Sequence, residues 1–138
     1  MKVRSGFVSN SSSSSYVICV AKVTDEEKLR AFCEMHNLDC EVYTTEEALN
    51  YDGWNRKTTK RGDKTYFYNE SFDGNEVSIE MDTEANEKLV SLSYYEDIME
   101  DEDGPVEPDF IEDGGIYSLK EENGVTDINV TQGYGRNG

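Results

Sequence analysis

Three side chains in the first third of the chain have the chemistry of metal ligands. Cys33 and Cys40 carry thiols, and His36 between them carries the one imidazole of the 138-residue chain. Thiolates and imidazoles bind zinc, and Cys19 offers a fourth ligand from a neighbouring strand. The spacing C-x2-H-x3-C differs from the familiar zinc patterns. Because Cys33 and His36 also fall on the apolar face of an expected helix, we interpret them as core side chains and predict no metal and no cofactor.

Carboxylates form the densest cluster of charged groups. Residues 96–113 contain ten acids in eighteen positions. A calcium loop needs oxygen ligands at positions 1 and 12 when glycine stands at position 6, and placing Gly104 there puts Met99 and Phe110 at those positions. An EF-hand is therefore excluded, and the alternatives are a solvated loop or a binding surface. The acids that we expect to contact a partner are Asp97, Glu100, Asp101, Glu102, Asp103, Asp109, Glu112 and Asp113.

One basic cluster lies beside Trp54 and Tyr66. Its members are Arg56, Lys57, Lys60, Arg61 and Lys64. Bases next to aromatic rings bind single-stranded nucleic acid in many proteins. In a chain of net charge −17 we instead expect these bases to pair with the acidic second half, residues 65–138, or with an acidic patch on a partner, and we predict no direct binding of nucleic acid.

The chain carries no recognisable catalytic motif. It has no G-x-S-x-G, no phosphate-binding P-loop and no Rossmann glycine fingerprint. We therefore assign no catalytic residues and favour a protein that is not an enzyme. An enzyme of unidentified chemistry stays an alternative.

The elements that would hold these residues begin with an apolar run. Residues 16–23 are continuously apolar and rich in β-branched side chains, which predicts a strand covered on both faces. Thr24 and Glu27 have the spacing of a capping box, and the apolar spacing after them predicts a helix to about His36. Residues 40–43 fit a second short strand.

Further along, the pattern changes from helical to alternating. Thr44 and Glu47 form a second capping box that predicts a brief helix, and residues 52–62 are polar and predict a loop. Antiparallel strands are expected at residues 63–69, 77–81 and 89–95 as a meander, and at 116–121 and 125–131 as a hairpin around Asn123-Gly124.

Together these elements predict one domain of the α+β class, with a short βα(β) start followed by antiparallel sheet. We divide the chain into a serine-rich leader at residues 1–15, the α+β domain at 16–132 with an acidic loop at 96–115, and a frayed end at 133–138. A chain of this length can bury one modest core.

The charge is distributed unevenly. Residues 1–64 carry ten bases and ten acids, whereas residues 65–138 carry three bases and twenty acids. Such a field repels nucleic acid and acidic membranes and attracts basic protein surfaces. No stretch approaches the roughly 18 apolar residues of a membrane-spanning helix. The beginning of the chain does not fit a secretory signal, so we expect the protein in a cytoplasm or inside a particle assembled there.

Residues 4–16 read RSGFVSNSSSSSY. This string resembles an N-terminal signature, R-x-G-F-V-S-N-S-S-S-S-S-F, at the start of many uncharacterised bacteriophage and bacterial proteins; the departure is tyrosine for phenylalanine at Tyr16. The residues that carry the resemblance are Arg4, Gly6, Phe7, Val8, Asn10, Ser11, Ser15 and Tyr16. It implies a phage or mobile-element setting and nothing about the fold of residues 24–138. The head is a transferable tag, a disordered leader or a segment folded back on the core.

These observations predict a small acidic accessory protein of phage type. We expect it to bind a host or phage protein that has a basic surface, such as a nucleic-acid-binding enzyme, in the infected cell. Because duplex DNA carries a phosphate about every 1.7 Å of its axis, clustered carboxylates can mimic it. The alternative is a minor virion component carried by its tag. The sequence predicts no particular oligomeric state.

Overall fold

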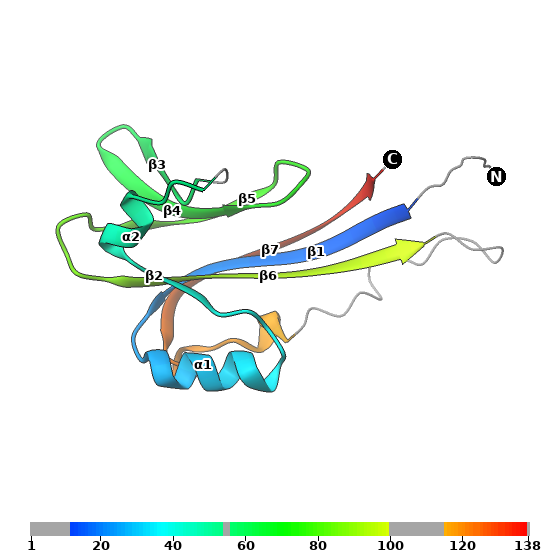
Figure 1. The fold of residues 1–138 in the computed structure, drawn as a ribbon, viewed down its shortest axis with the longest axis horizontal. Coiled ribbons are helices and arrows are strands. Elements are labelled where there is room, and N and C mark those ends of the chain that lie inside the picture. The colour runs from blue at the N-terminus through cyan, green and yellow to red at the C-terminus, as the bar shows by residue number, and fades with distance from the viewer. Residues whose placement is uncertain (1–11, 54–55, 100–114, 138) are drawn as a thin grey trace.

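Strand β1 (Ser12–Val23) lies at the centre of the fold. The computed structural model describes residues 12–53, 56–99 and 115–137. A four-stranded antiparallel sheet has the order β2-β6-β1-β7, and a three-stranded antiparallel sheet has the order β3-β4-β5 (Figure 1). The other strands of the first sheet are β6 (Lys88–Met99) and β7 (Val125–Asn137), which pair with β1, and β2 (Glu41–Thr44), which pairs with β6. Two helices complete the described fold, which confirms the α+β class.

The β1 residues from Tyr16 to Ala21 are fully buried. Because side chains alternate along a strand, Val17, Cys19 and Ala21 enter the cluster that packs under helix α1 (Glu26–Met35). Tyr16, Ile18 and Val20 enter a second cluster on the opposite face. Figure 1 shows α1 on one side of the first sheet and the three-stranded sheet on the other. The prediction of a strand covered on both faces is confirmed.

The N-cap of helix α1 lies one residue later than the sequence predicts, at Asp25 and not at Thr24. The N-cap is Asp25, whose side chain accepts a hydrogen bond from the backbone N–H of Lys28 at 3.2 Å, so the capping box expected at Thr24 is replaced. The helix ends before Asn37, which has a positive φ of 57°. Leu29, Phe32 and Cys33 are buried against the sheet, as their spacing predicts.

Helix α2 (Thr45–Leu49) follows β2 directly. Thr44 and Glu47 form the expected capping box. The backbone N–H of Glu47 donates to Thr44 Oγ1 at 3.1 Å, and the backbone N–H of Thr44 donates to Glu47 Oε1 at 2.9 Å. This prediction is confirmed. In the part of the chain that the structure describes, no helix is long and apolar enough to span a membrane.

The three-stranded sheet contains one strand that the sequence analysis did not predict. Its strands are β3 (Thr58–Arg61), β4 (Lys64–Glu70) and β5 (Glu76–Met81). The polar residues 58–61, expected in a loop, pair with β4 through a turn at Gly62. Since β3 buries little and lies at the sheet edge, polar side chains are tolerated there. The apolar side chains of β4 and β5 close the core over β1.

The expected meander and hairpin do not form, although the α+β class holds. β4 and β5 pair with each other, but β6 leaves them and inserts between β1 and β2 in the other sheet. β1 and β2 therefore run parallel on either side of β6, which preserves the expected βα(β) start.

Residues 116–121 and 125–131 do not form the hairpin expected around Asn123-Gly124. Short 3-10 turns at Ile116–Ser118 (η2) and Glu121–Asn123 (η3) precede β7, which pairs with β1 instead. The Gly124 carbonyl accepts hydrogen bonds from the backbone of Thr24 at 2.8 Å and of Asp25 at 3.1 Å. A Cβ at Gly124 would overlap the Asp25 carbonyl oxygen. The glycine therefore permits a close approach to the start of α1.

The long strands extend past the ends that the sequence analysis assigned. Ser12–Ser15, expected in the leader, pair with Glu96–Met99 of β6 and with Tyr134–Asn137 of β7. The expected boundary between residues 15 and 16 thus falls inside β1. Residues 96–99, expected in the acidic loop, and 133–137, expected to be frayed, are strand residues because β1 supplies backbone partners to both. In Figure 1 these ends run side by side away from α1.

Replacing Leu29, which is fully buried, tests the packing of α1 on β1. We expect Leu29→Ala to lower the free energy of unfolding by about 2–5 kcal/mol, because it removes buried methyl groups and leaves a cavity. Met35→Ala is the control, since Met35 on the same helix is 77% exposed and its truncation should cost less than about 0.5 kcal/mol. Urea unfolding measures both, and equal losses would contradict the packing described.

Candidate functional site

The acidic residues expected to contact a partner lie mostly outside the described residues. Asp97 belongs to β6, opposite Ser14 of β1. The other seven lie within residues 100–113, which the structure does not describe. Of the N-terminal signature, Ser15 and Tyr16 are described in full; Arg4, Gly6, Phe7, Val8, Asn10 and Ser11 lie outside. Trp54 beside the basic cluster also lies outside.

The described residues form a charged cleft between the two sheets. It has a volume of about 540 Å³, within the range of roughly 300–1,000 Å³ that is usual for ligand pockets. Lys22 of β1 and Asp127 of β7 line it from the first sheet, and residues 63–65 and 79–83 line it from the second. No local pattern in the sequence indicates this cleft, because its walls come from four separate segments of the chain.

Lys22 is the charged centre of this cleft. Its Nζ lies 3.0 Å from Glu87 Oε1 and 3.7 Å from Asp127 Oδ2. The hydrogen bond to Glu87 raises the pKa of Lys22, so this side chain is a cation and not a nucleophile. Asp127 has a positive φ of 55° and lies where the β1–β7 register shifts between Val20 and Lys22. This bulge directs the Asp127 carboxylate towards Lys22.

The cleft has an excess of acidic side chains, because both of its lysines already form ion pairs with acids of the chain. Its two bases are Lys22 and Lys64, and Lys64 Nζ lies 3.5 Å from Glu80 Oε1. Asp63 and Asp82 line the cleft as well, and neither has an ion pair with a described residue. Among the described lining residues there is no cysteine, histidine or serine. The arrangement suits the binding of a cation such as a lysine or arginine side chain.

A second polar network surrounds Tyr16, the last residue of the N-terminal signature. Its hydroxyl donates to the Asp73 carboxylate, with 2.7 and 2.9 Å to the two oxygens, and accepts from Asn75 Nδ2 at 2.9 Å. Hydrogen bonds from Ser71 and then Tyr16 lower the pKa of Asp73. A Cβ at Gly133 would overlap the Tyr16 hydroxyl, so the glycine opposite leaves room for it. Tyr16 thereby ties β1 to the turn between β4 and β5.

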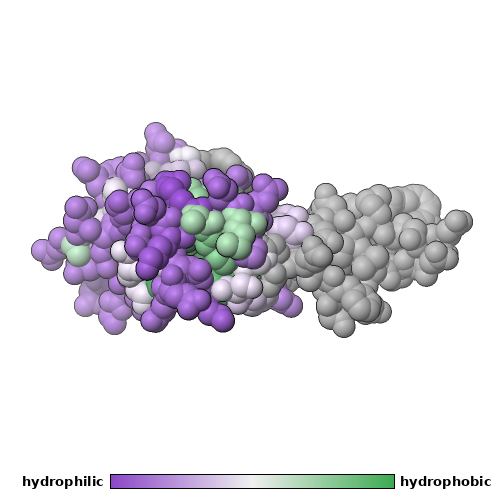
Figure 2. Space-filling view, turned by 90° about the horizontal axis from the view of Figure 1, so that it is seen from below, coloured by the Kyte–Doolittle hydropathy of each residue, from purple (hydrophilic) through white to green (hydrophobic). Residues whose placement is uncertain are grey.

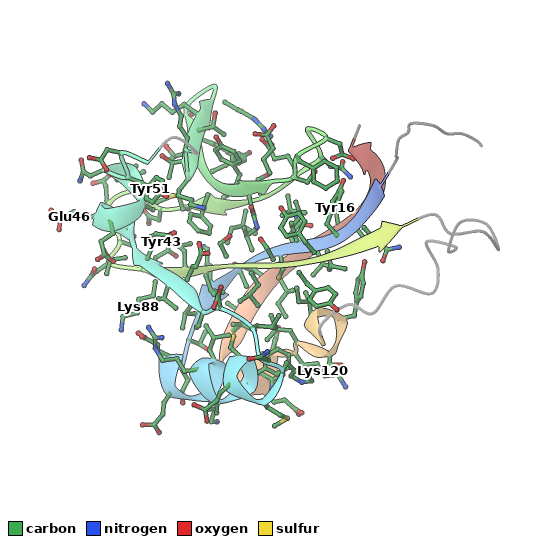
Figure 3. All side chains as sticks on the ribbon, turned by 45° about the vertical axis from the view of Figure 1, so that its right-hand side comes forward. Tyr16, Tyr43, Glu46, Tyr51, Lys88 and Lys120 are labelled. Atoms are coloured by element: carbon green, nitrogen blue, oxygen red, sulfur yellow. The ribbon has the colours of Figure 1, made fainter. Side chains whose placement is uncertain are left out.

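The expected pairing of the basic cluster with the acidic second half is confirmed for two of its five members, and a third, Lys57, pairs with an acid of the first half. Lys57 is buried, with its Nζ 3.9 Å from Glu41 Oε1. The same Nζ lies 5.8 Å from the centre of the Tyr43 ring and 5.4 Å from that of Tyr51. Figure 3 labels these two rings near α2. The other two ion pairs are Arg61–Glu76 and Lys64–Glu80.

The three thiols belong to the core. Cys19 and Cys33 are buried in the cluster under α1, and Cys40 packs against it. His36 lies with its ring centre 4.5 Å from that of Phe32. Burial raises the pKa of Cys19 and of Cys33 to about 12. Within residues 12–53, 56–99 and 115–137, no group of three or more His, Cys, Asp or Glu side chains could hold a metal ion.

Comparison with known proteins found no relative of this chain. No protein-family model matches the chain. Neither a curated protein nor a solved structure gives a match. Any functional conclusion therefore depends on the residues themselves.

Removing one oxygen from Tyr16 tests the network that holds the β4–β5 turn. We expect Tyr16→Phe to lower the free energy of unfolding by about 1 kcal/mol or more, because the hydroxyl donates to a carboxylate. Tyr117→Phe is the matched control, since the exposed Tyr117 hydroxyl donates to Gln132 at the surface and water can replace that bond. The comparison is made by urea unfolding. An unchanged midpoint for Tyr16→Phe would show that the network does not stabilise the fold.

The raised pKa values of Cys19 and Cys33 predict slow alkylation of the native protein. The thiolate is the reactive form, and at pH 8 a thiol with a pKa of about 12 is almost fully protonated. We expect iodoacetamide to modify at most the partly exposed Cys40 in the folded protein and all three cysteines in guanidinium chloride, as counted by mass spectrometry. Rapid modification of three thiols in the native state would contradict the burial described.

Proposed function

We propose that this protein is a non-enzymatic binding protein that captures a partner with a basic surface and competes with nucleic acid for that surface. The observation that carries the proposal is the acidic cleft between the two sheets, in which both lysines are already paired. The resemblance of residues 4–16 supports a phage or mobile-element setting for this activity, in an infected cell.

The use of bases inside the chain supports this proposal. Six described lysines and arginines are in ion pairs with acids of the same chain: Lys22, Arg30, Lys57, Arg61, Lys64 and Lys88. The chain has thirty acids and thirteen bases, so this pairing leaves a large acidic excess at the surface. Such an excess attracts a cationic surface and repels phosphate.

The surface that carries α1 favours electrostatic over apolar contact. Figure 2 shows this face as mainly hydrophilic over its described part, with a hydrophobic area near the centre. Large apolar patches are the usual sign of a hydrophobic interface. Their scarcity on this face favours a partner held by charge, and such binding weakens as salt screens charges beyond about 10 Å at 0.1 M.

Fluorescence polarisation with a labelled lysine-rich peptide as the probe tests the proposal. We expect binding at low salt that weakens steadily as sodium chloride is added, and we expect unlabelled duplex DNA to compete for the peptide. A labelled duplex oligonucleotide should not bind the protein directly. Absence of peptide binding at low salt, or direct binding of the duplex, would overturn the proposal.

A pair of charge-reversal variants locates the binding surface. Asp63→Lys with Asp82→Lys places two bases in the cleft, and we expect the peptide to bind about tenfold more weakly, since each surface charge pair contributes up to about 1 kcal/mol. The control, Glu34→Lys with Asp39→Lys, makes the same change in net charge at exposed positions near the end of α1. An equal loss in both variants would show that the cleft is not the binding surface.

A further inference from the structure

Two half-exposed aromatic rings lie together beside the Tyr16 network. Phe72 is 48% exposed and Tyr95 is 47% exposed. Their ring centres are 6.2 Å apart, and each also contacts the buried ring of Tyr16, at 5.3 and 6.1 Å. Aromatic side chains that are held in place but exposed are enriched at binding hot spots, since little conformational entropy is lost when they are covered.

An ionised carboxylate stands next to these rings. Asp73 Oδ1 accepts from the hydroxyls of Tyr16 and Ser71 and from the backbone N–H of Asn75. Asp73 Oδ2 receives the longer contact from the Tyr16 hydroxyl, at 2.9 Å. A carboxylate oxygen accepts about two hydrogen bonds, so Oδ2 retains capacity for another donor. The charge of Asp73 also contributes to the raised pKa of Tyr95, after burial and Tyr16, which indicates that its field reaches that ring.

Three other rings in the described part of the chain have a lysine or arginine of the same chain over them. Lys57 lies over Tyr43 and Tyr51, and the Arg61 guanidinium carbon lies 5.6 Å from the centre of the Tyr66 ring. Each of these bases is also paired with a carboxylate, Glu41 or Glu76. Ring, cation and carboxylate thus occur together twice, once around Lys57 beside β2 and once around Arg61 on the second sheet.

The rings of Phe72 and Tyr95 have the carboxylate of that arrangement without the cation. No described lysine or arginine lies over either ring. The missing component is a cation, and the net charge of −17 favours its delivery by another molecule.

We propose that Phe72, Tyr95 and Asp73 form an anchor site for an arginine side chain of the basic partner, with the guanidinium over the rings and an N–H on Asp73 Oδ2. This inference rests on the proposed function and adds the chemistry of its partner. Arginine fits better than lysine because its planar group stacks on a ring while its edge donates to a carboxylate. Cation–π contacts of this kind are worth about 0.5–1 kcal/mol at exposed sites, which corresponds to a two- to fivefold change in affinity.

Two labelled basic peptides that differ only in carrying arginine or lysine test the anchor. We expect wild-type protein to bind the arginine peptide about two- to fivefold more tightly, and we expect Phe72→Leu to remove that preference while the lysine peptide binds as before. Phe72 is half exposed in a turn, so leucine is tolerated there. Tyr117→Leu, at a tyrosine that is 50% exposed, is the control and should keep the preference.

The outcomes separate this inference from the proposed function. Equal affinity of both peptides for wild-type protein, with the cleft variants still weakening both, would overturn the anchor and leave the proposed function standing. Loss of the arginine preference in Tyr117→Leu as well as in Phe72→Leu would also overturn the anchor. Failure of both peptides to bind would overturn both proposals. Aromatic NMR shifts of Phe72 and Tyr95 that move only with the arginine peptide would support the anchor.

Discussion

The fold depends on the burial of one strand from both sides. Six consecutive residues of β1, from Tyr16 to Ala21, are fully buried, and neither a single helix nor a single sheet could cover both faces. Each large apolar side chain buried in this way contributes about 1.5–3 kcal/mol. The helix α1 and the three-stranded sheet are therefore required by the same strand. The Tyr16 network, the cleft and the aromatic rings all lie where the second sheet covers the first.

The same arrangement reconciles a strongly acidic chain with a folded domain. Self-repulsion among carboxylates opposes a compact state. Here the bases of the second sheet lie next to acids of the same sheet, as in Lys64–Glu80 between the neighbouring strands β4 and β5 and in Arg61–Glu76 between the outer strands β3 and β5. Exposed pairs of this kind each add little stability, but they keep the sheet from carrying unbalanced charge. The remaining acids are left at the surface, where they can act on another molecule.

The sequence predicted those elements whose formation depends on residues close to one another in the chain. The apolar run in β1, the apolar face of α1 and the capping box at Thr44 are all patterns within a few residues. Strand β3 was not predicted, because an edge strand buries little and its sequence is polar. The hairpin predicted at Asn123-Gly124 was wrong, because Gly124 makes a tertiary contact with Asp25 instead. The partnership of β6 with β1 joins residues far apart in sequence. For the same reason the cleft at Lys22 and the grouping of Phe72 with Tyr95 had no sequence signal, whereas the pairing of the basic cluster followed from composition.

The serines at the start of β1 depend on segments that lie far from them in the sequence. Ser12–Ser15 have a strand on each side, and Tyr16 is held by a hydroxyl contact that a phenylalanine at the same place could not make. These residues therefore need two antiparallel neighbours for the serine backbone and a carboxylate in the β4–β5 turn for the Tyr16 hydroxyl. The conformation at the start of β1 is thus determined by segments far along the chain, including Asp73, which lies 57 positions after Tyr16.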